Sequence, residues 1–188
     1  MSVNAILDGS AVTPVEPQPV IRAERLVLRP LRKSDAGLLS LYSGDRRVAE
    51  GTRAIPHPLP PGMTEAYIAR AESPKRVEDV WALDGSEQGL AELLGVISLT
   101  HIDNNQSEVG YWVAPAFWNA GFASEAMAAL LAANPHKSRT LFAEAFQDNP
   151  ISARVLTNAG FRYLGDAEAY SIARGSNVPT WTYLRPMT

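Results

Sequence analysis

Residues 108–127 read EVGYWVAPAFWNAGFASEAM, and this stretch decides the fold. Residues 108–113 favour a β-strand, and Pro115 ends it because proline cannot donate to a sheet ladder. Gly121 then leads into an alanine-rich helix, which we expect to end near Ala133, before Asn134 and Pro135. The stretch therefore predicts a strand, a tight glycine turn and an immediate helix.

The start of this helix has the chemistry of an anion site. The first amides of a helix lack intrahelical partners, and the helix dipole adds partial positive charge beside them. The small residues at 120, 121, 123 and 124 would let a diphosphate approach these amides without a lysine. The nucleotide-binding signatures GxxxxGK(S/T) and GxGxxG are both absent. From spacing alone, an ordinary helix start in the core is the competing interpretation.

The segments on either side predict one sheet with helices packed against it. In chain order we expect a strand at 25–31, a helix from Ser34 as N-cap, a rigid loop at 55–62, a helix at 64–72, strands at 77–83, 93–100 and 107–113, the helix from 121, a strand at 140–146, a short helix at Pro150, a strand from 161 to 164, and a hairpin of 167–174 and 179–184. Turn-type residues separate the three central strands, which indicates an antiparallel meander.

This order of elements predicts an α+β (mixed α/β) domain with one central, mostly antiparallel twisted sheet. We assign residues 21–188 to that domain. Residues 1–20 contain several prolines and little to bury, so we expect an extended or disordered arm there.

Composition excludes several classes of function. The 188 residues carry a formal net charge of −3, which gives no basic footprint for nucleic acid. The absence of cysteine excludes disulfides, thiolate metal sites and a cysteine nucleophile, and the three histidines lack ligand-like spacing, so no metal is expected. No apolar run approaches the roughly 18 residues of a membrane span. We therefore expect a cytoplasmic protein, and a homodimer is left open.

Three motifs resemble those of the GNAT superfamily of N-acyltransferases, most closely its RimJ- and RimL-like branch of ribosomal-protein N-terminal acetyltransferases. Residues 108–126 are similar to the family's E-(I/V)-G-Y-W-(I/V) strand and W-G-(Q/K)-G-(Y/I)-A-T-E-A turn. Residues 149–161, NPISARVLTNAGF, resemble N-x-x-S-x-x-(V/L)-(L/M)-x-K-x-G-F. Residues 24–30, ERLVLRP, resemble the family's opening strand. The motifs occur in the family's order.

The resemblance implies acetyl-CoA as cosubstrate. In the family, two central parallel strands splay apart, helices cover both faces of the sheet, and the pantetheine arm enters the gap beside a strand in which we expect a bulge. The implied cofactor contacts are Tyr111, Trp112, Val113, Trp118, Asn119, Ala120, Gly121, Phe122, Ala123, Ser124, Asn149 and Ser152. Asn149 has a helix N-cap as its competing interpretation.

Two departures from the family pattern bear on phosphate binding. Asn119-Ala120 stand where the family often has glycine and a polar or basic residue, and Asn158 stands where lysine is common. We therefore expect main-chain amides to carry more of the diphosphate binding.

The resemblance also implies catalytic roles for Glu108, as a base acting through water, and for Ser152, as a donor to the leaving thiolate. A surface charge and a first-turn helix serine are the competing interpretations. Some relatives place a tyrosine acid where this chain has Leu156, so that role is vacant there. Because the chain has no cysteine, an acyl-cysteine intermediate is excluded and direct transfer is expected.

The acceptor that the family implies is a primary amine, either a protein N-terminus or a small molecule. An α-amino group, with a pKa of about 7.7–8.0, needs less help from a base than lysine does. The 52–62 loop and the final hairpin around Tyr170, Arg174 and Trp181 are candidates to line the acceptor side, with ordinary packing as the alternative. A non-catalytic acyl-CoA-binding or sensing module on the same fold is the alternative function.

Overall fold

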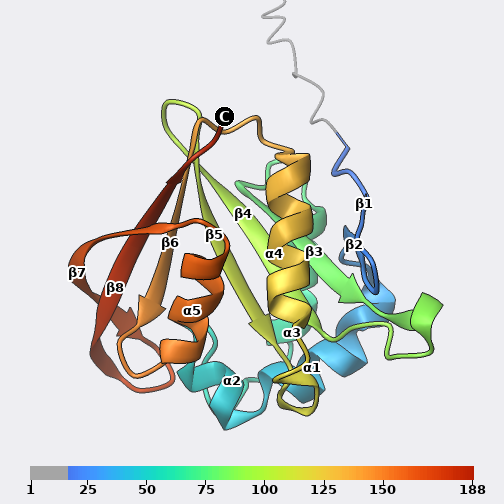
Figure 1. Cartoon of the computed structure of the whole chain (residues 1–188). Helices are drawn as coiled ribbons and strands as arrows, with labels where there is room; N and C mark the ends of the chain where they lie inside the picture. The colour runs from blue at the N-terminus through green and yellow to red at the C-terminus, as the bar shows by residue number, and fades with distance from the viewer. Residues whose placement is uncertain (1–16) are drawn as a thin grey trace, which may run out of the picture.

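The computed structural model of the protein describes residues 17–188 (Figure 1). Most of the expected arm, residues 1–16, lies outside the described residues. The remainder of the arm contacts the third strand of the sheet: the Gln18 amide donates to the carbonyl of Val80, and the Trp81 indole donates to the carbonyl of Pro19, each at 2.8 Å.

One eight-stranded sheet forms the centre of the molecule, in the order β1-β2-β3-β4-β5-β6-β8-β7. The strands are β1 (Ile21–Arg22), β2 (Val27–Pro30), β3 (Glu78–Asp84), β4 (Gly95–Ile102), β5 (Gln106–Val113), β6 (Thr140–Phe146), β7 (Arg162–Ser171) and β8 (Ser176–Pro186). Among these strands, which all lie within residues 17–188, only β5 and β6 pair in parallel, and every other neighbouring pair is antiparallel. The predicted fold class is therefore confirmed.

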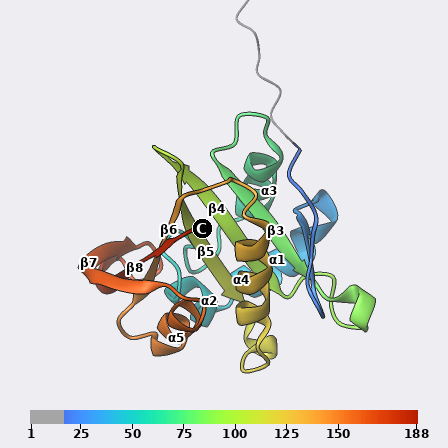
Figure 2. The ribbon, with the colours of Figure 1, turned by 45° about the horizontal axis from the view of Figure 1, so that its top comes forward.

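Helices cover both faces of the sheet (Figures 1 and 2). They are α1 (Ala36–Ser43), α2 (Arg46–Glu50), α3 (Met63–Glu72), α4 (Phe122–Ala133) and α5 (Pro150–Asn158). The larger core packs α4 and α5 against one face, through Met127, Leu130 and Leu156. The smaller core packs α1 and α3 against the other face, through Leu39 and Ile68.

The two parallel strands separate part-way along their length. Their pairing runs from Gln106 opposite Thr140 to Val109 opposite Ala143, although both strands continue beyond that point. Figure 1 shows β5 and β6 diverging toward the end of the molecule that carries α2. We call this divergence of β5 and β6 the fork.

The prediction of a bulge in β5 is wrong. The β4–β5 register is continuous from Gly95 opposite Val113 to Ile102 opposite Gln106. The fork therefore forms because β6 leaves β5, while β5 stays fully paired with β4. The splayed parallel pair is present without a distorted strand.

Other local predictions need correction. Ser34 is not the N-cap of α1, because the chain enters that helix through a 3-10 turn (Lys33–Asp35) in which the carboxylate of Asp35 accepts the amide of Arg32 at 2.9 Å. The strands expected at 161–164 and 167–174 form one strand, β7, with a register shift at Tyr163/Gly165. The short helix α2 was missed, since five residues are too few for a periodic signal.

Within residues 17–188 no helix combines the length and the apolar content that a membrane crossing requires. The same part of the chain holds no group of three or more His, Cys, Asp or Glu side chains arranged to bind a metal ion.

Candidate active site

The turn before α4 presents open amides on the α4–α5 face. Gly121 adopts φ 79° and begins the helix without a side-chain cap, so the first amides of α4 have no capping acceptor. Asn119 adopts φ 59°, a left-handed conformation that asparagine tolerates better than most residues. Of the predicted contacts in this turn, Trp118, Asn119, Ala120, Gly121 and Ser124 are exposed, Ala123 is partly buried and Phe122 is buried.

Arg25 places a cation beside this turn, a feature that the sequence analysis missed. Its guanidinium donates to the carbonyl of Ala120 at 2.9 Å and pairs with Glu125 at 2.7 Å. The same carboxylate accepts the main-chain amides of Arg25 and Leu26. The family-like motifs at 24–30 and 108–126 therefore meet through Arg25 and Glu125, and the pair joins the start of α4 to the β1–β2 connection.

The predicted strand contacts differ in what their main chains offer. The carbonyl of Trp112 lies against Gly95, where an added Cβ would approach it to 2.2 Å, so this carbonyl faces β4. The carbonyl of Val113 accepts the Trp118 indole N–H at 2.7 Å. Because successive main-chain groups point to opposite sides of a strand, the amide and carbonyl of Tyr111 face the fork. Val113 lies on the same side, but its carbonyl already accepts the Trp118 indole, so Tyr111 is the position of the three whose amide and carbonyl we expect to meet a ligand in the fork.

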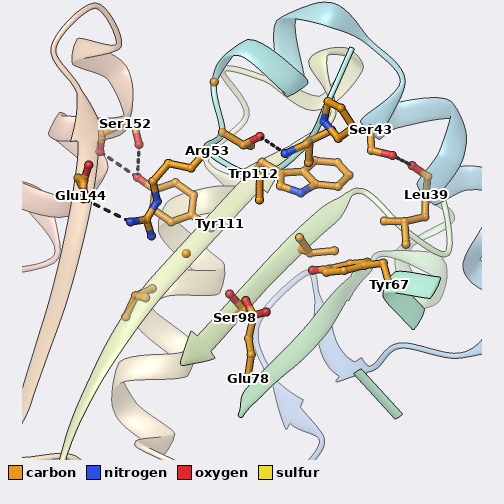
Figure 3. Close-up of a pocket in the computed structure, with 18 of the residues that line it drawn as sticks. Leu39, Ser43, Arg53, Tyr67, Glu78, Ser98, Tyr111, Trp112, Glu144 and Ser152 are labelled. Carbon is orange, nitrogen blue, oxygen red and sulfur yellow. Dashed lines mark hydrogen bonds and ion pairs between the residues drawn. The ribbon is translucent and has the colours of Figure 1, made fainter. Parts of the chain in front are cut away.

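Tyr111 also links β5 to α5 across the fork. Its hydroxyl lies 2.7 Å from Ser152 Oγ and 2.9 Å from the Ser152 carbonyl (Figure 3). Burial raises the pKa of Tyr111 to about 12, although the hydrogen bond with Ser152 acts in the opposite direction. The Asn149 side chain caps α5 by accepting the Ser152 amide at 3.2 Å, which is the N-cap interpretation. Leu156 is fully buried in the core.

A cavity of about 330 Å³ lies at the fork, lined mainly from the α1–α3 side and also by Tyr111 and Ser152 (Figure 3). Glu108 of β5, Glu144 of β6 and Glu78 of β3 line it, together with the aromatic side chains of Tyr67 and Trp112. Gly110 and Asn149 also contribute, as does most of the 51–59 loop. The candidates Tyr170, Arg174 and Trp181 are not among its lining residues, which agrees with the alternative of ordinary packing. Arg174 donates to the Glu50 carbonyl and fastens the start of that loop.

The carboxylates of this cavity differ in their partners. Glu108 forms an ion pair with Arg53, whereas Glu144 is 3.5 Å from the same guanidinium. Within residues 17–188, Glu144 Oε1 is buried without a hydrogen-bond partner. Glu78 of β3 and Glu108 of β5 both pair with Thr100 of β4, which lies between them. Their main chains are therefore two strand spacings, or about 10 Å, apart. The cavity is therefore lined by carboxylates on β3 as well as on β5 and β6.

The sequence analysis identified Glu108 but missed Glu144, Glu78 and Arg53. The alternation of TLFAEAF already places Glu144 on the opposite face from the buried Ala143 and Ala145. Nothing local marks Arg53, which is brought to the fork by the packing of its loop against the β7–β8 turn.

Comparisons with known proteins agree with this geometry. The family model for the acetyltransferase (GNAT) domain matches residues 25–162. The chain is 24% identical over 174 residues to the uncharacterized N-acetyltransferase YoaA of Bacillus subtilis, covering 88% of this chain and 95% of that protein.

Solved structures share the fold. A RimL ribosomal-protein acetyltransferase in complex with coenzyme A has a TM-score of 0.75 at 18% identity, covering 90% of this chain and 98% of that one. Spermidine N-acetyltransferase from Vibrio cholerae, in complex with CoA and spermine, has a TM-score of 0.73 at 15% identity, covering 87% and 96%. With the family match over most of its length, the chain belongs to the acetyltransferase (GNAT) family as an N-acetyltransferase.

Proposed function

We propose that this protein transfers an acetyl group from acetyl-CoA directly to a primary amine, either a protein N-terminus or a small molecule. The observation that carries the proposal is the fork, which joins open helix amides on one face to a carboxylate-lined cavity on the other. A thioester entering from the α4 side would meet an amine entering from the α1–α3 side. The absence of cysteine supports direct transfer.

The α4–α5 face suits the cosubstrate. The uncapped amides at the start of α4 and the nearby guanidinium of Arg25 would hold the diphosphate. The fork-facing main chain of Tyr111 would pair with the pantetheine arm. The Asn149 side-chain oxygen already caps α5, so its amide nitrogen is the group left for the ligand.

The leaving thiolate needs a proton donor, and Ser152 with Tyr111 would supply one. Because burial raises the pKa of Tyr111 to about 12, its hydroxyl stays protonated at neutral pH. The hydroxyl of Tyr111 contacts Ser152, the serine that the family motif indicates. This tyrosine comes from β5, whereas some relatives carry one at the position of Leu156. These contacts support Tyr111 and Ser152 as the proton donors on the cosubstrate side, where Leu156 cannot serve.

Two carboxylates compete for the role of base. Glu108 is the residue that the family motif indicates, but Arg53 already holds it. Glu144 has a buried oxygen without a partner in the described part of the chain, and such an oxygen is available to a proton on an amine or on a bridging water. We propose that Glu108 or Glu144 acts as the base, with Glu108 as the candidate that the family motif indicates.

The acceptor assignment rests on the cavity and on the relatives. Three carboxylates favour an amine that arrives as a cation. The RimL and spermidine enzymes act on a ribosomal protein and on a polyamine by their names, so both kinds of acceptor are candidates. The RimJ/RimL-like branch favours the peptide N-terminus. A sensing module that binds acyl-CoA without turnover is the alternative function.

The test is thiol release from acetyl-CoA over a panel of amines and peptides, with the product identified by its mass shift. We expect release with at least one acceptor; binding without release for every acceptor would favour the sensing module. Glu108→Gln and Glu144→Gln should each lower the rate most at low pH, where the amine most needs a base. A variant whose pH–rate profile matches wild type would lose that role.

A further inference from the structure

Arg53 lies at the centre of the acceptor side of the fork. Its guanidinium forms an ion pair with Glu108 of β5. It also lies 3.5 Å from Glu144 of β6 (Figure 3), so it bridges the two strands at the point where their pairing ends. Both partners are candidate bases for the proposed transfer. The guanidinium therefore occupies the place where a cationic acceptor would have to lie.

The main chain that carries Arg53 is fastened at Arg53 itself and three residues before it. The carbonyl of Arg53 accepts the amide of Ile172 at 3.0 Å, and the carbonyl of Glu50 accepts Arg174 Nε at 2.9 Å. The side chain of Arg53 is 51% exposed. The guanidinium can therefore leave the carboxylates by side-chain rotation while its loop stays in place.

The contacts of this guanidinium are weak enough to be exchanged. Ion pairs between partly exposed side chains contribute little to stability, because solvent screens them and holding two long side chains costs entropy. The distance to Glu144 is long for a charge-assisted hydrogen bond, and Glu144 Oε1 has no partner within residues 17–188. Arg53 thus leaves the carboxylate pair incompletely satisfied.

We propose that Arg53 is an internal mimic of the acceptor ammonium group, which holds Glu108 and Glu144 until the acceptor displaces it. This proposal rests on the proposed transfer to an amine. A guanidinium and an ammonium are both cations that only donate hydrogen bonds. The compact ammonium has three donors, enough to contact both carboxylates and to reach the unpaired oxygen of Glu144.

Displacement has a chemical consequence. A carboxylate that is held by a guanidinium is a poor proton acceptor, whereas one that contacts the acceptor itself is placed to accept its proton. Arg53 therefore competes with the acceptor for the same subsite. Removing its charge should tighten acceptor binding and leave acetyl-CoA binding on the opposite face unchanged.

The first test measures the subsite without any turnover. Methylguanidinium chloride is titrated into wild type and into Arg53→Ala, with binding followed by calorimetry or by amide chemical shifts. We expect at least about tenfold tighter binding to Arg53→Ala, since the vacated carboxylates receive the same cation. Adding Glu144→Gln to that variant should remove most of the gain. Equal affinity of wild type and Arg53→Ala would overturn the proposal.

Two control variants separate occupancy from folding. Arg46→Ala removes a similar cation that pairs with Glu50 on the exposed side of α2, outside the cavity, and should bind methylguanidinium as wild type does. Arg53→Lys keeps a cation in the loop and should still exclude the probe. A thermal melt of each variant checks that the fold is retained; tight binding by Arg53→Lys would contradict the proposal.

The second test uses catalysis, with n-butylamine and Ala-Ala-Ala amide as probe acceptors. For an acceptor that wild type acetylates, Arg53→Met should lower the KM of the amine about threefold or more and leave the KM of acetyl-CoA within about twofold. A raised amine KM would make Arg53 a binding residue and would end the mimic role. If wild type acetylates neither probe nor any amine in the wider panel, the proposed function fails, and the methylguanidinium result still decides whether Arg53 fills a cation subsite.

Discussion

The two sides of the fork are built in different ways. On the α4 side, the turn at 118–121 and the first residues of α4 form one continuous stretch whose main-chain amides are the proposed diphosphate contacts. On the α1–α3 side, the site gathers the side chains of Arg53, Glu78, Glu108 and Glu144 from a loop and three strands. One side is therefore a backbone site, and the other is a side-chain site.

This difference predicts how each side responds to substitution. A backbone site changes little when a side chain is trimmed, and it fails when a charge or a bulky group is added. A side-chain site changes as soon as one carboxylate is neutralised. It also follows that the cosubstrate side can stay constant among relatives whose acceptors differ.

The largest effect should come where the two sides meet, at Tyr111. Replacing Tyr111 by Phe removes the hydroxyl that lies 2.7 Å from Ser152 Oγ. Because positioned proton donors contribute rate factors of about 10² or more, we expect kcat to fall about a hundredfold in Tyr111→Phe, with little change in the KM of acetyl-CoA. Single-turnover thiol release checks this, and an unchanged rate would remove Tyr111 from the proton path.

The next effect tests the backbone site by adding charge. Ser124 is exposed in the first turn of α4, so Ser124→Glu would place a carboxylate beside the diphosphate. We expect acetyl-CoA affinity to fall about tenfold or more, measured by calorimetry. Gly121 is a poorer position for this test, because its φ of 79° would strain any side chain.

Ala132→Glu is the matched control for that experiment. Ala132 is exposed on the same helix, two turns further from its start, so its variant adds the same charge away from the diphosphate. Its acetyl-CoA affinity should match wild type. Equal losses in Ser124→Glu and Ala132→Glu would indicate a general charge effect and would remove the start of α4 as the phosphate site.

A smaller effect concerns the clamp behind the backbone site. Glu125 accepts the amides of Arg25 and Leu26 and pairs with the Arg25 guanidinium. Glu125→Ala should lower the free energy of unfolding by about 1–3 kcal/mol, because two partly buried donors lose their acceptor. Urea unfolding measures this. If Glu125→Ala unfolds at the same urea concentration as wild type, the clamp contributes nothing to the fold.

The last prediction concerns the ionisation of Tyr111, which has no effect on stability at neutral pH and acts only at alkaline pH. Burial raises the pKa of Tyr111 to about 12, above the value of about 10 of an unfolded chain. A raised folded-state pKa gives stability that is fully present below pH 10 and is lost as the pH rises toward 12. Wild type should therefore lose up to about 2–3 kcal/mol relative to Tyr111→Phe over that range. Parallel stability curves for the two proteins would contradict the burial of this hydroxyl.

The backbone site was largely predictable from the sequence. A strand, a left-handed glycine and a helix rich in small residues are local features, so residues 108–133 gave the turn and the bounds of α4 within one residue. The family-like motifs then gave the parallel pair. The motif did not tell that the Trp112 carbonyl faces β4, because sheet pairing decides which main-chain groups remain open.

The side-chain site was mostly not predictable. Glu108 was found because a motif contains it, but Glu144 and Glu78 become partners of Glu108 only through sheet register. Arg53 reaches the fork because distant segments, around Ser171 and Arg174, hold its loop. Contacts between residues more than a hundred positions apart leave no local pattern. The acceptor, the homodimer and the cytoplasmic location stay predictions.

The most direct test of the division between the two sides is an amide chemical-shift titration with coenzyme A, which needs no knowledge of the acceptor. We predict that the largest shifts fall on Gly121, Phe122, Ala123 and Ser124 and on Tyr111 in the fork. The amides around Glu78 and in α3 should stay nearly unchanged. Shifts confined to the α1–α3 side, with the start of α4 unaffected, would contradict the account.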